Sequence, residues 1–317
     1  MTLRERRVSL EARSDLDPAE FCEKYAAAAD EWLIGVARRA VGGTPHAPRG
    51  LALLAVGGYG RGELCPYSDL DLVLVHEGHE DVAAVADAIW YPVWDEGVHL
   101  DHSVRRPKEV LSMARADLRV ALGLLDARTV WGDRRVGDPL IDAARAQWCD
   151  DLGLASLDEL ARQFDARRST HGDLAFLLEP DLKEAHGGLR DMDVLRAVAS
   201  CAPALSGAVD LPGLVPARRV LHDARVALHR AAGRRLDRLV LQEQDQVAST
   251  LGYPDADALM SAIAAAGRWI AWTCDGAWRR RDRWDPARRP PVRPSRRWPL
   301  RRWRDGAAAS LPSGVAA

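Results

Sequence analysis

Two short apolar segments lie close together in the first quarter of the chain. Residues 51–56 (LALLAV) are apolar throughout, which is typical of a strand buried on both faces. After a glycine-rich interruption, residues 69–75 (DLDLVLV) resume the apolar pattern and predict a second strand. Residues 98–105 alternate well enough to predict a third. The pattern therefore predicts three strands between residues 51 and 105.

Apolar residues recur at helical spacing over much of the remaining sequence. The first of these segments has a clear predicted start. Asp17 is a good N-cap, Pro18 suits the first helical position, and Glu20 lies near the capping-box position. Helices are predicted over residues 21–41, 81–94, 108–125, 156–168, 192–200, 217–235 and 255–279.

The strand pattern fades after residue 106, and this change predicts the domain organisation. We expect an N-terminal helix and linker (1–50), a core that contains the strands (51–106) and a mainly helical domain (107–278). Arginine, proline and tryptophan dominate residues 279–317. Because this tail offers no apolar core, it is expected to be disordered.

Bulk composition excludes several classes of protein. At 317 residues, with 47% hydrophobic and 28% charged residues, the chain is long enough for two domains and resembles soluble proteins. Its N-terminus lacks the apolar core of a secretory signal, and no run reaches the ~18–20 apolar residues of a membrane span. A net charge of −2 gives no general argument for nucleic acid. Five separated cysteines without a C-x-x-C argue against disulfides or zinc, so we expect a reduced, cytoplasmic protein.

The segment between the first two strands carries the candidate chemistry. Gly57 and Gly58 follow the first strand, and Asp69 and Asp71 open the second. Because side chains alternate along a strand, the two carboxylates project from one face with their Cα atoms about 6–7 Å apart. Two carboxylates so placed repel each other unless a cation lies between them. These residues therefore predict a Mg²⁺ site of the kind that nucleotidyl transfer needs.

Two other interpretations fit parts of this segment. G-x-G-x-G after a strand also occurs in Rossmann dinucleotide-binding loops, but here a second strand begins about ten residues on, too soon for the helix of a βαβ unit. The aspartates can also belong to an ordinary turn that opens a strand. The paired glycines before them and the apolar strand after them favour the catalytic interpretation.

Further polar groups lie outside this segment. The third predicted strand carries another carboxylate, Asp101. Residues 178–191 are rich in charge and contain paired glycines, as expected of an ordered loop that leads into a helix. Within it, Lys183, Arg190 and Asp191 either shape a nucleotide- or partner-binding surface or form salt bridges inside the loop. The arginines of the tail are either solvated, which we favour, or bind nucleic acid.

Three blocks of sequence carry a family resemblance. They are GGYGRGEL followed by P-x-S-D-x-D, then Trp94-Asp95 with DHSVR at 101–105, and finally LEP through LK to GGLRD at 178–191. Together they resemble the nucleotidyltransferase portion of the bacterial PII uridylyltransferase/uridylyl-removing enzymes of nitrogen regulation. The match is specific because the three blocks occur in the same order. The arginine-rich composition and the DHSVR block look like the actinobacterial branch.

The resemblance implies an α+β fold: a DNA-polymerase-β-like nucleotidyltransferase domain, with a small mixed sheet and flanking helices, followed by a mainly helical domain. It also implies Mg²⁺-dependent transfer of UMP or AMP, from UTP or ATP, to a tyrosine of the PII protein. The catalytic and metal-binding residues would be Asp69, Asp71 and, as the candidate third carboxylate, Asp101. The nucleotide-binding residues would be Gly57, Gly58, Arg61 and Ser68.

The resemblance leaves several alternatives open. The motif holds phosphates and metal rather than the base, so it does not distinguish UTP from ATP. The hydrolase and glutamine-sensing ACT domains of full-length members are not expected here, since no H-D signature follows residue 250. A nucleotidyltransferase with a different acceptor, and a non-catalytic relative that binds PII or nucleotide, are the other hypotheses.

Overall fold

A computed structural model describes residues 1–13, 15–43, 48–202 and 211–281. The chain divides into two compact units, Met1–Gln147 and Trp148–Ala317, which are considered in turn. Among the described residues, no helix is both long enough and apolar enough to cross a membrane. Most of the tail for which disorder was predicted lies outside the described residues.

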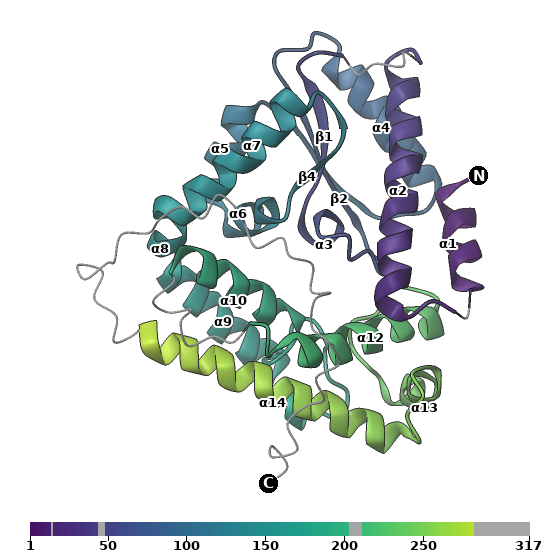
Figure 1. Cartoon of the computed structure of the whole chain (residues 1–317), viewed down its shortest axis with the longest axis vertical. Helices are drawn as coiled ribbons and strands as arrows, with labels where there is room; N and C mark the ends of the chain where they lie inside the picture. The colour runs from purple at the N-terminus through teal and green to yellow at the C-terminus, as the bar shows by residue number, and fades with distance from the viewer. Residues whose placement is uncertain (14, 44–47, 203–210, 282–317) are drawn as a thin grey trace. The chain divides into compact units, whose positions relative to one another are not determined.

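Unit 1 is built around a four-stranded sheet with the strand order β3-β2-β1-β4 (Figure 1). Strand β1 (Leu51–Ala55) pairs antiparallel with β2 (Leu70–His76) and with β4 (Arg128–Gly132). Strand β2 pairs parallel with β3 (Leu100–Arg105). The three predicted strands are present, and the small mixed sheet implied by the resemblance is confirmed.

The burial of the strands explains the apolar pattern of the sequence. All five residues of β1 are buried, as expected of a central strand covered on both faces. At the start of β2, buried and partly exposed residues alternate, so Asp71 and Val73 share the less covered face. The carboxylate of Asp71 therefore projects from a part of the sheet that solvent reaches.

Helices α2 (Pro18–Ala40) and α4 (Val82–Asp95) lie side by side along one face of this sheet (Figure 1). Helix α2 begins as predicted. The Asp17 carboxylate accepts from the N–H of Glu20 at 2.8 Å, and the Glu20 side chain accepts from the N–H of Asp17. A short helix that was not predicted, α1 (Leu3–Glu11), packs against α2.

On the other side of the sheet, α7 (Arg134–Gln147) packs against β1, β2 and β4. The single helix predicted over residues 108–125 is in fact two helices, α5 (Pro107–Ala116) and α6 (Leu118–Leu125). The prediction was wrong because Asp117 leaves the helical conformation. Its side chain caps α6 by accepting from the N–H of Arg119 at 2.8 Å.

The boundary of unit 1 differs from the one expected from the sequence. Strand β4 and helix α7 lie in a region that the sequence assigned to the helical domain, yet β4 extends the sheet by pairing with β1. The compact unit consequently continues to Gln147 and does not end near residue 106. The apolar pattern of strands ends near residue 106 because the local sequence changes there. The compact unit extends further because β4 pairs with β1, which is distant in the sequence.

Unit 2 is helical in its described part, as expected. Helices α9, α10, α12 and α14 correspond to predicted segments, while α13 was not predicted. The last helix ends at Arg281, beyond the expected limit at residue 278. The elements are η1 (Trp148–Leu152), α8 (Gly153–Ala155), α9 (Leu157–His171), η2 (Leu174–Phe176), α10 (Leu189–Cys201), α12 (Val215–Ala232), α13 (Leu241–Thr250) and α14 (Ala256–Arg281).

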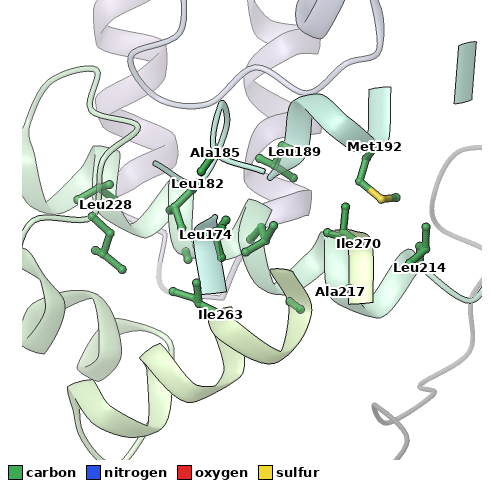
Figure 2. Close-up of a cluster of buried hydrophobic side chains, with 14 of the residues drawn as sticks. Leu174, Leu182, Ala185, Leu189, Met192, Leu214, Ala217, Leu228, Ile263 and Ile270 are labelled. Atoms are coloured by element: carbon green, nitrogen blue, oxygen red, sulfur yellow. The ribbon is translucent and has the colours of Figure 1, made fainter. Parts of the chain in front are cut away.

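Side chains from α10, α12 and α14 form an apolar core in unit 2 (Figure 2). Leu182 and Ala185, which belong to the segment between η2 and α10, are fully buried in the same core. Burial of a leucine side chain stabilises a fold by roughly 1.5–3 kcal/mol. The segment is therefore an ordered loop, as the sequence predicted, and its own apolar residues anchor it.

Candidate active site

The glycine-rich segment after β1 forms a single helical turn, α3 (Gly57–Gly60). The N–H of Gly60 donates to the carbonyl of Val56 at 2.9 Å, and the N–H of Arg61 donates to that of Gly57 at 3.1 Å. Gly57 has a φ of +57°, a left-handed conformation that side-chain-bearing residues rarely adopt. The backbone of the turn itself thus requires glycine at position 57.

Space gives a second reason for glycine at this position. A Cβ atom on Gly57 would lie 3.1 Å from Oδ2 of Asp71, closer than ordinary van der Waals contact. The turn and the start of β2 are also joined through the backbone, since the N–H of Val56 donates to the carbonyl of Asp71 at 3.0 Å. The structure therefore brings the glycine turn and the Asp71 carboxylate together.

The third predicted carboxylate lies on the neighbouring strand. Asp71 on β2 and Asp101 on β3 are partners in the parallel register. Residues paired in this way project from the same face of a sheet, with strands about 4.8 Å apart. Asp69 comes directly before the first residue of β2. The starts of two adjacent strands thus bring Asp71 and Asp101 to one face of the sheet, and Asp71 is the one shown beside the turn.

Two predicted nucleotide-binding residues have more complex surroundings. Arg61 donates from Nε to Glu63 and from Nη1 to Asp126, both at 2.7 Å. Because two carboxylates already compensate its guanidinium, Arg61 holds the loop, and a role at the phosphates stays a prediction. Ser68 lies in the turn before β2, where its N–H donates to the carbonyl of Cys65 at 3.0 Å. This contact involves the backbone only, so the proposed role of the Ser68 side chain in nucleotide binding also stays a prediction.

Several residues that the sequence did not identify as site residues contact the turn or one another around it. The Tyr59 hydroxyl donates to Asp30 at 2.6 Å, and Arg128 donates to the same carboxylate. Gly60 packs so closely on the carbonyl of Asp126 that a Cβ atom would overlap it. No local pattern identifies these residues, because α2, the turn and β4 lie far apart in the sequence.

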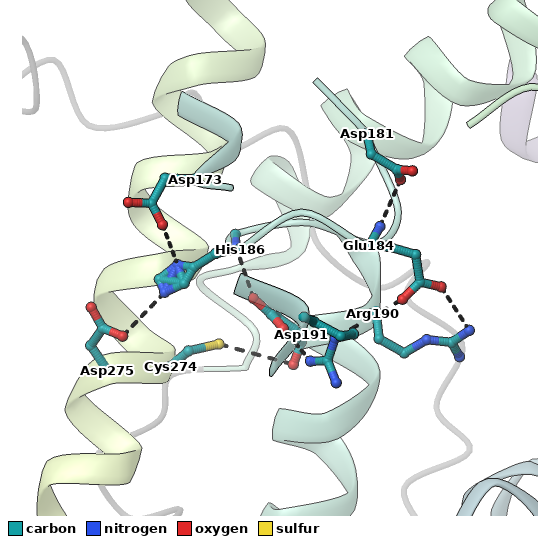
Figure 3. Close-up of polar contacts among 10 residues, drawn as sticks. Asp173, Asp181, Glu184, His186, Arg190, Asp191, Cys274 and Asp275 are labelled. Atoms are coloured by element: carbon teal, nitrogen blue, oxygen red, sulfur yellow. Dashed lines mark hydrogen bonds and ion pairs between the residues drawn. The ribbon is translucent and has the colours of Figure 1, made fainter. Parts of the chain in front are cut away.

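The loop before α10 contains a polar network of its own (Figure 3). Asp191, which is 2% exposed, accepts from Nη2 of Arg167 at 2.7 Å and from the N–H of Gly187 at 2.8 Å. Arg190 donates to Glu184 at 3.0 Å. Of the two interpretations open for Arg190 and Asp191, the structure favours ion pairs within unit 2.

His186 ties this loop to other elements of the unit (Figure 3). Its Nε2 lies 3.2 Å from Oδ1 of Asp275 on α14, and its Nδ1 lies 3.6 Å from Oδ1 of Asp173. Burial and two arginine neighbours lower the pKa of Lys183, and burial raises the pKa of Asp191 in spite of its arginine partner. The contacts of Asp191 and His186 named here are all with residues of unit 2.

The three carboxylates predicted as metal ligands are of the kind that suits a divalent cation. Mg²⁺ prefers oxygen ligands and usually takes one or two carboxylates together with phosphate oxygens of the substrate. The missing Cβ of Gly57 leaves room directly beside Oδ2 of Asp71. The oxygen donors and the space next to Asp71 are therefore compatible with Mg²⁺, and it stays a prediction that Asp69, Asp71 and Asp101 would hold the ion.

A glycine turn joined to carboxylate-bearing strands of a small mixed sheet defines a nucleotidyltransferase domain. A comparison with known families agrees, because residues 46–121 match the family described as "Nucleotidyltransferase domain". This range contains the turn, β2, β3 and all of the predicted site residues.

The particular family follows from the rest of the chain. Residues 155–274 match the family described as "GlnD PII-uridylyltransferase". The bifunctional uridylyltransferase/uridylyl-removing enzyme of Streptomyces coelicolor is 51% identical over 254 residues, which are 79% of this chain and 29% of the relative. The enzyme of the same name from Mycobacterium tuberculosis (strain CDC 1551 / Oshkosh) is 40% identical over 273 residues, 84% of this chain and 33% of the relative.

These matches place the chain in the bacterial PII uridylyltransferase/uridylyl-removing enzyme family, as a counterpart of its nucleotidyltransferase portion. A third relative, from Corynebacterium glutamicum, is 38% identical over 223 residues, 70% of this chain and 31% of the relative. The chain thus spans about a third or less of the length of these relatives. The family resemblance read from the three sequence blocks is confirmed.

Proposed function

We propose that this protein is a Mg²⁺-dependent nucleotidyltransferase that transfers UMP or AMP, from UTP or ATP, to a tyrosine of a PII protein in the cytoplasm. One observation carries the proposal: Asp71 lies directly beside the position that a Cβ of Gly57 would occupy, and its register partner on the adjacent strand is Asp101. The family named for PII supplies the acceptor.

In this reaction the tyrosine oxygen forms a bond to the α-phosphorus, and the bond from that phosphorus to pyrophosphate breaks. Mg²⁺ would supply charge neutralisation at the phosphates. The backbone N–H groups at the start of α3, around Gly57 and Gly58, suit the negative charge of the triphosphate. Asp101, the most exposed of the three carboxylates, is our candidate for accepting the proton that the tyrosine releases, unless it serves as a metal ligand.

The identity of the donor base does not follow from the turn and the carboxylates. The turn and the carboxylates would bind the triphosphate and Mg²⁺, and the triphosphate is the same in UTP and ATP. The experiment is therefore a parallel incubation of the purified chain with PII, Mg²⁺ and either labelled UTP or labelled ATP. Label on PII with one of the two supports the proposal and identifies the donor, and label should disappear when EDTA replaces Mg²⁺.

Two other outcomes would contradict parts of the proposal. If a folded sample binds Mg²⁺-nucleotide but labels PII with neither donor, the acceptor is a different molecule or the protein is a non-catalytic binder. A screen for release of labelled pyrophosphate in the presence of other acceptors separates these two cases. Failure to bind either nucleotide at millimolar concentration would refute the nucleotidyltransferase assignment itself.

A further inference from the structure

Three residues from distant segments of unit 1 meet behind the glycine turn. Arg128 on β4 makes a two-pronged ion pair with Asp30 on α2, with Nη1 at 2.6 Å from Oδ2 and Nη2 at 2.9 Å from Oδ1. The Tyr59 hydroxyl, from the turn itself, donates to the same Oδ1 at 2.6 Å. We call Asp30, Tyr59 and Arg128 the loop clamp.

Arg128 also contacts the backbone of the turn. Its Nε donates to the carbonyl of Gly60 and its Nη2 to the carbonyl of Tyr59, both at 3.2 Å. These two carbonyls belong to the same peptide planes as the N–H groups of Gly60 and Arg61, which close the turn. Because a peptide unit is planar, fixing its oxygen also fixes the direction of its N–H. One guanidinium therefore holds both peptide planes at the end of α3.

The chemistry of the loop clamp favours a rigid arrangement. Hydrogen bonds between a guanidinium and a carboxylate are charge-assisted, and a two-pronged pair fixes orientation as well as distance. The Tyr59 side chain is almost fully buried. Burial, together with the Asp30 carboxylate, raises the pKa of Tyr59 well above its ordinary value, so its hydroxyl remains a donor. The matched nucleotidyltransferase region, residues 46–121, includes neither Asp30 nor Arg128.

We propose that Asp30 and Arg128 are positioning residues for nucleotide binding. They hold the turn in the orientation in which Gly57 and Gly58 present their N–H groups to the triphosphate. This inference rests on the proposed function, but it makes a separate claim about the immobility of residues 57–63 that is measurable without nucleotide.

The test compares Asp30→Asn with Glu31→Gln. Glu31 is the next residue on the same helix and pairs with Arg6 at 2.9 Å, so its substitution also removes an arginine partner without touching the turn. We expect Asp30→Asn to weaken Mg²⁺-ATP or Mg²⁺-UTP binding about tenfold, as for the loss of a charged hydrogen bond. In transfer assays, the KM for the nucleotide should therefore rise, and kcat should change less. Glu31→Gln should stay within about twofold of wild type.

Hydrogen exchange gives the readout that does not depend on nucleotide. In Asp30→Asn, the amides of residues 60–63, which donate to backbone carbonyls of residues 56–59, should exchange about tenfold faster, while those of β2 (70–76) keep their wild-type rates. Arg128→Lys should give the same pattern, since an ammonium cannot span both carbonyls and the carboxylate. Tyr59→Phe, which loses only the hydroxyl, should give a smaller change.

The outcomes separate the two proposals. Unchanged exchange at residues 60–63 in both Asp30→Asn and Arg128→Lys overturns the clamp, whatever the wild type binds. If exchange rises but nucleotide affinity stays at the wild-type value, the positioning role in binding is overturned. If the wild type binds no nucleotide, the proposed function fails together with that role, and exchange alone decides whether the clamp immobilises the turn.

Discussion

The most direct test of the candidate site is Gly57→Ala, because a single methyl group touches both the turn and a predicted metal ligand. Gly57 has a φ of +57°, and the new Cβ would lie 3.1 Å from Oδ2 of Asp71. The backbone can accept alanine only with left-handed strain, and the carboxylate can accept the methyl only by moving a few tenths of an ångström.

The two effects have different magnitudes. Left-handed strain in a residue with a side chain costs about 1–2 kcal/mol. For a unit of this size that loss corresponds to a decrease in Tm of roughly 3–8 °C. Displacement of Asp71 adds little to this cost, because a partly exposed carboxylate can shift. In catalysis, however, a displacement approaching 1 Å costs about a hundredfold, so we expect transfer to fall by more than about tenfold.

Gly62→Ala is the matched control. Gly62 lies in the same loop and has a φ of +78°, but a Cβ there would meet no atom within 4 Å. Both variants should therefore lose similar stability in thermal unfolding, and only Gly57→Ala should lose transfer in the PII labelling assay. Measuring transfer well below both Tm values removes the contribution of unfolded protein.

Two results would refute this reasoning. Equal transfer by the Gly57→Ala and Gly62→Ala variants would show that the space beside Asp71 does not matter for the reaction. A Gly57→Ala variant as stable as wild type would show that the turn does not need the left-handed backbone observed here.

Three further predictions address the carboxylates and unit 2. Asp71→Asn removes a metal-binding charge at constant size and should lower transfer at least about a hundredfold; retained labelling of PII would show that Asp71 is not catalytic. Gly187→Ala should cost about 2–4 kcal/mol in urea unfolding, because its φ is +87° and a Cβ would overlap the carbonyl of Gly267; Gly233→Ala, with strain but open space, should cost only about 1 kcal/mol, and equal losses would count against the contact. Burial opposes ionisation of Asp237, but histidine, arginine and lysine neighbours outweigh it and hold its pKa well below the usual range. A carboxylate with a lowered pKa stabilises the fold fully at any pH above its pKa in the unfolded chain, which is about 4, and this stabilisation is lost as the pH falls. The difference in free energy of unfolding between wild type and Asp237→Asn should therefore shrink by about 1 kcal/mol from about pH 5 to pH 3. A difference that does not depend on pH would contradict this prediction.

The elements that the sequence predicted well are those whose cause is local. The start of α2 depends on Asp17 and Glu20, three residues apart, and both capping bonds are present. Strand β1 was recognisable because a strand covered on both faces is apolar at every position. The ordered loop before α10 could be recognised from its glycines and charges, although its burial depends on distant helices.

The elements that were missed have causes that are distant in sequence. Strand β4 (RTVWG) is short and has only one buried residue, so it shows no period by itself and exists because β1 offers a free edge. The break at Asp117 required knowing that its side chain would cap α6 instead of continuing α5. The sequence was enough to propose each carboxylate as a site residue. That Asp71 and Asp101 are neighbours follows only from the pairing of β2 with β3.

The glycine turn has a recognisable local sequence, but its shape depends on residues that are distant in the sequence. Four of the six residues 57–62 are glycines, which allow close approach and left-handed backbone but leave the unfolded chain unusually free. A turn so poor in side chains has few groups with which to hold its own shape, so its rigidity has to come from neighbours. Arg128 fixes two of its carbonyls, and Asp126 receives its one arginine. Asp126 lies two residues before β4 and Arg128 is its first residue, so a strand that was not predicted and the residues just before it hold the most readily predicted motif in place.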